Sequence, residues 1–228
     1  MTIAGFSTLL ERNADHAQHF ENERFDSVQA GQSPEFVTVC CSDSRVLQDE
    51  MFENREPGHV FTCGNIGNRV VENTADGMRV SGDVLYPLAH TGTKNVVVIG
   101  HTGCGAVTAT YEDATSGIDE PAGIRHCVDL LKTQLTDGIE LLPDDLDDSE
   151  TINRLVEYNV DRQVEFLLDS DDVSSEVDVL GAVYDFQNVY SNERGRLHVV
   201  NVNGEIERGR IEDEHSELAE RMNRLWTY

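Results

Sequence analysis

The sequence predicts an α/β fold with a mostly parallel central sheet that is flanked by helices. Two short apolar runs, 36–40 and 95–100, indicate buried strands, and each leads directly into a polar motif. Strand-like runs also alternate with helix-like stretches along the rest of the chain. Because parallel strands end at one edge of a sheet, both motifs are expected at the edge where open α/β folds bind ligands.

The other elements follow in order along the chain. Residues 4–30 combine helical spacing with many charges, and they predict an N-terminal helical arm. We expect acidic loops at 143–150 and 169–176, a glycine-rich loop at 64–68, strands at 59–63, 177–184 and 197–202, and helices at 72–91, 105–111, 124–135, 152–168 and 212–226. No repeat or linker divides the sequence, so residues 1–228 are expected to form a single domain, with 1–30 as its arm.

The charge balance excludes several kinds of partner. The chain has 43 acidic and 17 basic residues, for a net charge of −26, and only two of the basic residues are lysines. Such a surface repels nucleic acid and anionic membranes, so we expect neither as a partner. Solubility alone could account for the excess, but the scarcity of lysine favours a halophile, where the Debye length shrinks to about 3 Å at 1 M salt.

The cysteine count and the chain start point to the cytoplasm. Five cysteines are an odd number in a chain of ordinary size, which argues against a disulfide framework and for a reducing compartment. The first residues show neither the basic segment nor the apolar stretch of a signal peptide. No apolar run approaches membrane-spanning length. A soluble cytoplasmic protein is therefore expected.

Two motifs carry the metal-ligating chemistry. Residues 41–45 read Cys-Ser-Asp-Ser-Arg, and residues 101–104 read His-Thr-Gly-Cys. Two thiolates and one imidazole suit Zn²⁺, and three protein ligands leave the open position that a catalytic zinc needs. The alternative is a structural site whose fourth ligand is another cysteine, with Cys40, Cys63 and Cys127 as the candidates. Adjacent strand residues point to opposite faces, so only one of Cys40 and Cys41 can face the metal.

Together the two motifs, about 60 residues apart and each at a strand end, resemble those of the β-class carbonic anhydrases. The resemblance covers the chain from about Gly31 to Asp185. It implies that Cys41, His101 and Cys104 hold the zinc ion. It further implies that the arm packs across a partner subunit, in a homodimer or a higher homo-oligomer.

The resemblance also implies a catalytic dyad. In the family, the arginine at the position of Arg45 keeps the aspartate at the position of Asp43 off the metal. The aspartate then accepts a hydrogen bond from zinc-bound water, and the hydroxide attacks CO₂ to give bicarbonate and a proton. An ordinary turn salt bridge is the alternative explanation of this pair.

Four more residues match positions that contact substrate in the family. Gln32 would donate its amide to a substrate oxygen, although alone it would be taken for a polar turn residue. Phe61, Ile66 and Tyr86 match apolar and aromatic positions of the CO₂ pocket, some of which the neighbouring subunit donates. Without the resemblance, Phe61 and Tyr86 would be assigned to the core.

The expected activity is the zinc-dependent, reversible hydration of CO₂ to bicarbonate. A hydrolase of carbon disulfide or carbonyl sulfide would use the same site. A non-catalytic zinc protein, structural or bicarbonate-sensing, is the alternative from another class. Regulated family members bind inhibitory bicarbonate with a basic residue and a tryptophan, whereas this chain has Gly64 and Thr38 there. That departure speaks against bicarbonate sensing.

Overall fold

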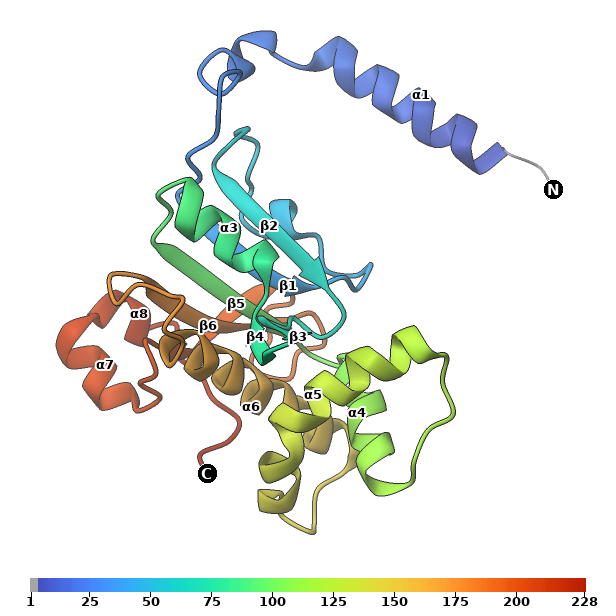
Figure 1. Cartoon of the computed structure of the whole chain (residues 1–228), viewed down its shortest axis with the longest axis vertical. Coiled ribbons are helices and arrows are strands. Elements are labelled where there is room, and N and C mark those ends of the chain that lie inside the picture. The colour runs from blue at the N-terminus through green and yellow to red at the C-terminus, as the bar shows by residue number, and fades with distance from the viewer. Residues whose placement is uncertain (1–3) are drawn as a thin grey trace.

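The computed structural model describes residues 4–228 and is built around a five-stranded sheet with the strand order β2-β1-β5-β6-β7 (Figure 1). The strands are β1 (Phe36–Cys41), β2 (Val60–Asn65), β5 (Asn95–His101), β6 (Asp178–Asp185) and β7 (Arg196–Val202). The first four are parallel to one another, and β7 pairs antiparallel with β6. The predicted α/β fold with a mostly parallel sheet is confirmed.

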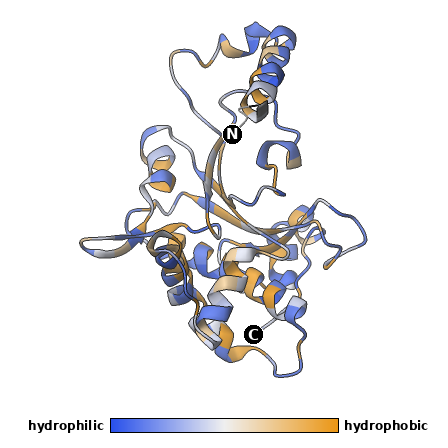
Figure 2. Ribbon diagram, turned by 90° about the vertical axis from the view of Figure 1, so that its right-hand side faces the viewer, coloured by the Kyte–Doolittle hydropathy of each residue, from blue (hydrophilic) through white to orange (hydrophobic). Residues whose placement is uncertain are grey.

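The strand register brings the two motifs to the same edge of the sheet. Cys41 at the end of β1 pairs with Asn65 of β2, and Cys40 pairs with Ile99 of β5. His101 therefore ends β5 beside the end of β1. Parallel strands with short apolar side chains are buried on both faces, which is why these strands appear as continuous hydrophobic runs. Figure 2 shows this apolar character along the central strands.

Four helices lie on one side of the sheet (Figure 1). They are α3 (Gly82–His90), α4 (Gly105–Thr115), α5 (Ala122–Leu141) and α6 (Asp148–Leu168), with the short α2 (Gln48–Met51), α7 (Arg208–Glu214) and α8 (Ser216–Ala219) elsewhere. Helix α6 packs on β5 and β6, and α5 packs on α6 and α4. None of the helices within residues 4–228 has the length and hydropathy needed to cross a lipid bilayer.

Helix α6 packs directly over Gly100 of β5, where the absence of a side chain leaves room for it. A Cβ atom at Gly100 would lie 2.8 Å from Cγ2 of Val160 and 2.9 Å from Cγ1 of Val156. The helix starts earlier than expected, inside the stretch predicted as an acidic loop. Asp147 accepts a hydrogen bond from the backbone N–H of Glu150, and the Glu150 carboxylate accepts one from the backbone N–H of Asp147. This reciprocal cap satisfies two free backbone donors.

The helix predicted over 72–91 is wrong in its first half. Residues 71–80 form an antiparallel hairpin of β3 (Val71–Thr74) and β4 (Gly77–Val80), and only 82–90 are helical. An Asp-Gly pair at the turn, with φ of +97° at Gly77, is a hairpin signal that the apolar spacing obscured. Ser81 then caps α3 by accepting a hydrogen bond from the Asp83 backbone.

The single C-terminal helix predicted over 212–226 is also wrong. The structure has two short helices, α7 and α8, and an extended segment from 222 onward. His215, with φ −142° and ψ 68°, interrupts the helical backbone between them. The backbone N–H groups of Leu225 and Trp226 donate to the buried carboxylate of Glu157. Tertiary hydrogen bonds thus replace the helical ones that the amphipathic pattern suggested.

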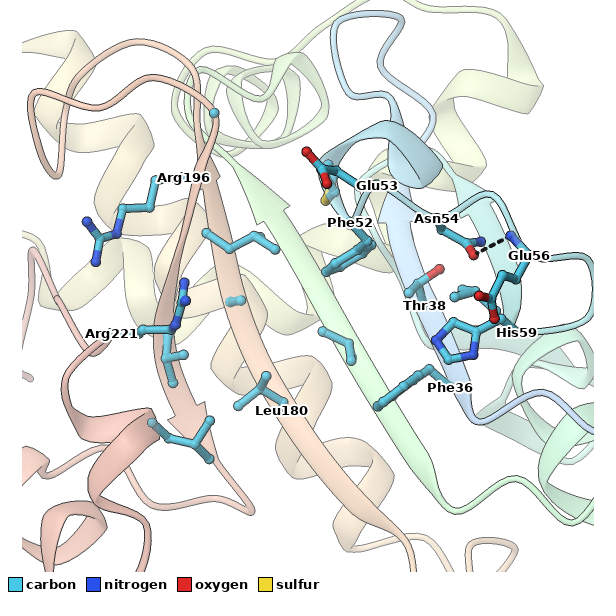
Figure 3. A pocket seen from close by; sticks show the side chains of 18 of the residues that line it. Phe36, Thr38, Phe52, Glu53, Asn54, Glu56, His59, Leu180, Arg196 and Arg221 are labelled. Carbon is cyan, nitrogen blue, oxygen red and sulfur yellow. Dashed lines mark hydrogen bonds between the residues drawn. The ribbon is translucent and has the colours of Figure 1, made fainter.

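The N-terminal arm consists of α1 (Ala4–His19) and a 3₁₀ turn (Asn22–Phe25), and it extends away from the sheet (Figure 1). Phe6, Leu9 and Leu10 occupy one helical face, and all three side chains are exposed. On the sheet face away from α6 lies a groove of about 790 Å³ (Figure 3). The arm and the groove are thus two apolar surfaces that one chain leaves uncovered.

Candidate metal centre

Three ligand atoms converge where β1 and β5 end. The Sγ atoms of Cys41 and Cys104 and a ring nitrogen of His101 all lie within 4.8 Å of one another, and all three residues are buried. Nδ1 of His101 lies 3.0 Å from the carbonyl oxygen of Thr102, so Nδ1 must carry the proton that this hydrogen bond needs. The lone pair therefore resides on Nε2, which has no hydrogen-bond partner among the described residues. An orphaned buried nitrogen beside two thiols is an arrangement that a metal ion would complete.

The donor set fits Zn²⁺. The two sulfur atoms lie 4.0 Å apart, too far for a disulfide bond and close enough to share one cation. A hydrogen bond from the Cys104 thiol lowers the pKa of Cys41 to about 4. The same contact, together with burial, raises the pKa of Cys104 well above its usual value. The pair therefore keeps one proton, and a bound divalent cation would displace it.

The opposite facing of Cys40 and Cys41 decides which of them is a ligand. Cys41 joins the main core beneath the helices, whereas Cys40 packs with Val46 and Ile99 on the other face of the sheet. Cys63 donates to the carbonyl of Asp83 instead. Within residues 4–228, His101, Cys41 and Cys104 form the only such cluster of potential metal ligands. This disfavours the structural site with a fourth cysteine.

A tight turn carries the chain from His101 to Cys104. Gly103 has φ of +61°, and a Cβ there would lie 2.8 Å from the side-chain amide of Gln187. Its backbone N–H donates to Oδ1 of Asn153 at 2.9 Å, which ties the turn to α6. Cys104 occupies the N-cap of α4, where the backbone N–H groups of Val107 and Ala106 lower its pKa, although Cys41 and burial raise it by more.

Asp43 and Arg45 form a bidentate pair beside the ligands. Oδ1 of Asp43 accepts from Nε of Arg45 at 2.8 Å, and Oδ2 accepts from Nη2 at 2.6 Å. Nη2 also donates to the carbonyl of Gly103 at 3.2 Å. These hydrogen bonds from Arg45 hold the pKa of Asp43 well below its usual range. Oδ2 of Asp43 lies 3.8 Å from Nε2 of His101, so the carboxylate is at the metal centre.

The four expected substrate residues are not brought together within one chain. Ile66 lies in the loop after β2, next to the edge that carries Cys41, and is half-exposed. Phe61 contacts Tyr86 of α3, with ring centroids 6.3 Å apart. However, Phe61 pairs with Val37, four residues or about 13 Å of strand before Cys41.

Gln32 lies farther still from the ligands of its own chain. It is exposed and precedes β1, whereas Cys41 is the last residue of that strand. The six residues of β1 span about 20 Å and separate the two ends. Gln32, Phe61 and Tyr86 therefore do not line the metal centre of the chain to which they belong.

The structure adds Phe186 to the site, a residue that sequence reasoning missed. Phe186 follows β6, which is parallel to β5 and ends beside it at this edge, and its ring contacts both Arg45 and His101. The rule that strand ends converge would have pointed to it, because the strand 177–184 was expected. Phe186 itself has no ligating or titratable atom, so the search for chemical motifs did not point to it.

Comparisons with known proteins agree with this geometry. A profile of the family described as carbonic anhydrase matches residues 36–191. A carbonic anhydrase of Emericella nidulans is 39% identical over 140 residues, which cover 60% of this chain and 57% of that protein. The crystal structure of a β-carbonic anhydrase from Aspergillus fumigatus has a TM-score of 0.71 at 25% identity and covers 94% of this chain and 98% of its own. This chain belongs to the β-class carbonic anhydrase family.

Further relatives show how much of the chain the similarity covers. A carbonic anhydrase of Pseudomonas aeruginosa is 39% identical over 88 residues, which cover 39% of this chain and 40% of that protein. The chain spans about half the length of the curated relatives that it matches. A tetrameric β-carbonic anhydrase from Sordaria macrospora shares the fold, with a TM-score of 0.67 at 24% identity over 87% of this chain and 95% of its own. The Cys-His-Cys cluster is consistent with the zinc site of the β class.

Proposed function

We propose that this β-class carbonic anhydrase interconverts CO₂ and bicarbonate with a Zn²⁺ ion held by Cys41, His101 and Cys104. The convergence of these three buried ligands carries the proposal, with a charged carboxylate 3.8 Å from His101 Nε2. When bound there, Zn²⁺ would supply the Lewis acid that makes a nucleophile of water near neutral pH.

The chain's own residues then have separate tasks. Asp43 stays ionised because Arg45 donates to both of its oxygens, so it can accept a hydrogen bond as a carboxylate and keep its charge. The ligands are buried, and the apolar side chain of Ile66 is half-exposed next to the sheet edge that carries Cys41. An apolar side chain in that position suits CO₂, which has no net dipole.

Stopped-flow measurement of CO₂ hydration on protein of known zinc content tests this function. We expect one zinc per chain and CO₂ turnover that Cys104→Ala abolishes together with zinc binding. Turnover of CS₂ or COS in place of CO₂ would assign the chain to the rival hydrolases. Full zinc content without any turnover would indicate a non-catalytic zinc protein.

We also propose that the site is completed by a second copy of the chain. The support is the position of Gln32, Phe61 and Tyr86 away from their own ligands, and the uncovered apolar face of α1. Apolar side chains line the groove, with Arg196 and Arg221 on one side and Glu53, Glu56 and His59 on the other (Figure 3), and Arg55 is also among its lining residues. In this arrangement the arm of one copy covers the sheet of the other, in a homodimer or a higher oligomer.

Light scattering of a charged arm variant tests this assembly. Leu10→Glu should shift the protein toward monomer and lower its activity, because an exposed apolar side chain that becomes buried in an interface cannot be replaced by a charge. Glu11→Gln, also on α1, is the matched control. An unchanged mass for Leu10→Glu would contradict a role of the arm in assembly.

Finally, we propose that residues 1–228 form one domain that works in the reducing cytoplasm of a halophile. A net charge of −26 with two lysines and five cysteines outside any disulfide support this environment. Activity and helical circular dichroism should fall together on desalting, because the Debye length grows to about 30 Å at 0.01 M. Molar KCl should protect both. Full stability in dilute buffer would contradict the halophile origin.

A further inference from the structure

The ring of Phe186 contacts two groups of the metal centre. The guanidinium carbon of Arg45 lies 4.7 Å from the ring centroid, within the range of a cation–π interaction. The imidazole of His101 stacks on the same side chain, with centroids 5.9 Å apart and planes inclined by 27°. One aromatic ring therefore touches both a metal ligand and the arginine of the dyad.

Arg45 needs such support because it is poorly enclosed. Its side chain is 49% exposed, and an ion pair with that much access to water is worth little by itself. Among the described residues outside its own turn, Arg45 has one hydrogen-bond partner: its Nη2 donates to the carbonyl oxygen of Gly103 at 3.2 Å. The ring of Phe186 supplies a second fixed contact, and it acts on the plane of the guanidinium.

Hydrogen bonds of the backbone at and after Phe186 fix the position of this residue. Its N–H donates to Oγ1 of Thr102 at 3.3 Å, so it is tied to the residue after His101. The buried carboxylate of Asp185 accepts from the backbone N–H groups of Gln187, Val189 and Tyr190, which holds the following turn. The side chain also packs against the small core cluster around Cys40. A ring anchored in this way can restrict a mobile neighbour.

We propose that Phe186 is a positioning residue that keeps Arg45 bound to Asp43 and thereby keeps the Asp43 carboxylate off the metal. The carboxylate lies only 3.8 Å from Nε2 of His101, so a small release of Arg45 places it within reach of the cation. Without the ring, Arg45 samples more orientations and Asp43 is freed more often. The inference rests on the proposed function for its catalytic meaning, but its structural content is measurable without turnover.

The test compares three variants. Phe186→Leu removes the ring face, and Phe186→Tyr keeps it. Phe166→Leu is the matched control, because Phe166 is another partly buried phenylalanine that packs on the main core from α6. All three are studied as full-length protein, with folding checked by circular dichroism.

The first readout is NMR of the Arg45 side-chain Nε–H in metal-free protein, with the signal assigned by its loss in Arg45→Lys. Its protection from solvent exchange should fall roughly threefold to tenfold in Phe186→Leu, the scale of a partly exposed cation–π contact. Phe186→Tyr and Phe166→Leu should match the unmodified chain. Unchanged protection in Phe186→Leu, or an equal fall in Phe166→Leu, overturns the proposal.

The second readout is the visible absorption spectrum of the cobalt-substituted protein. Phe186→Leu should change the ligand-field bands as Asp43 enters the coordination sphere, and adding Asp43→Asn should abolish that change. A spectrum like that of the unmodified chain, or a change that persists in the double variant, overturns the proposal. An unmodified chain without CO₂ turnover would remove the proposed function, whereas both of these readouts would still decide the role of Phe186.

Discussion

Two of the arginine–carboxylate pairings in this molecule, Arg45 at the metal centre and Arg224 against α6, differ sharply in burial. The Arg45 and Asp43 side chains are 49% and 16% exposed. Arg224 is 6% exposed, and its partners Glu157 and Asp161 are 0% and 3% exposed. The first pair lies on a turn at the sheet edge, and the second joins the C-terminal segment to a central helix.

The buried cluster satisfies nearly every polar atom that it contains. Arg224 donates to Asp161 at 2.8 Å, and Tyr190 donates its hydroxyl to Glu157 at 2.9 Å. Backbone N–H groups of Leu225 and Trp226 complete the shell of Glu157. Such a network costs much to disturb, whereas the exposed pair can rearrange at low cost. An arginine–carboxylate pair therefore stabilises the fold where it is buried, and it can change its conformation where it is exposed to water.

The largest expected effect is on catalysis, from Asp43→Asn. An amide has one acceptor oxygen in place of two and carries no charge, so it cannot accept from Arg45 at both atoms as the carboxylate does, and turnover should fall roughly 10²- to 10⁴-fold. Zinc content and the denaturation midpoint should stay close to those of the unmodified chain, because the pair is partly exposed. Turnover equal to that of the unmodified chain would remove Asp43 from the mechanism.

The complementary change at the buried cluster is Arg224→Met. It leaves Glu157 and Asp161 buried without their cation, so the free energy of unfolding should fall by about 3–5 kcal/mol. Urea denaturation measures this loss. Arg45→Met is the matched control, and its cost should stay below about 1 kcal/mol. Equal losses in the two variants would show that burial does not distinguish the clusters.

The sequence alone predicted those parts of the structure that depend on short, local patterns of residues. The strand ends at Cys41 and His101 follow from apolar runs of fixed length, and the alternation of side chains explains why Cys40 faces away. The metal centre could be predicted because two short motifs and one topological rule define it.

The remaining features depend on contacts that no local pattern records. Helical spacing over 212–226 gave no sign that Glu157 would capture the backbone of Leu225 and Trp226. Phe186 matters because its strand ends beside the strand that carries His101, and a phenylalanine has no ligating atom that a motif search would detect. In our proposal Gln32 acts in the site of a second chain. The spacing of residues within one chain gives no information about such a contact.

The smallest expected effect is the pH dependence of stability that the buried cluster contributes through Glu157. Burial raises the pKa of Glu157 from 4.5 to about 7, although Arg224 and the backbone donors act in the opposite direction. The folded state thus holds this proton more tightly than the unfolded state does. Stability from this group is therefore fully present below pH 4.5 and is lost as the pH rises through about 7.

Glu157→Gln isolates this contribution, because glutamine stays uncharged at every pH. Between pH 4.5 and 7 the unmodified chain should lose about 3 kcal/mol of unfolding free energy relative to Glu157→Gln, as expected for a pKa shift of this size. Urea denaturation at several pH values measures the difference. Glu165→Gln, an exposed position on the same helix, should show no such trend. The free energies of unfolding of the unmodified chain and Glu157→Gln could instead differ by the same amount at every pH. That result would mean that the hydrogen-bond donors around Glu157 outweigh its burial and that Glu157 is ionised throughout.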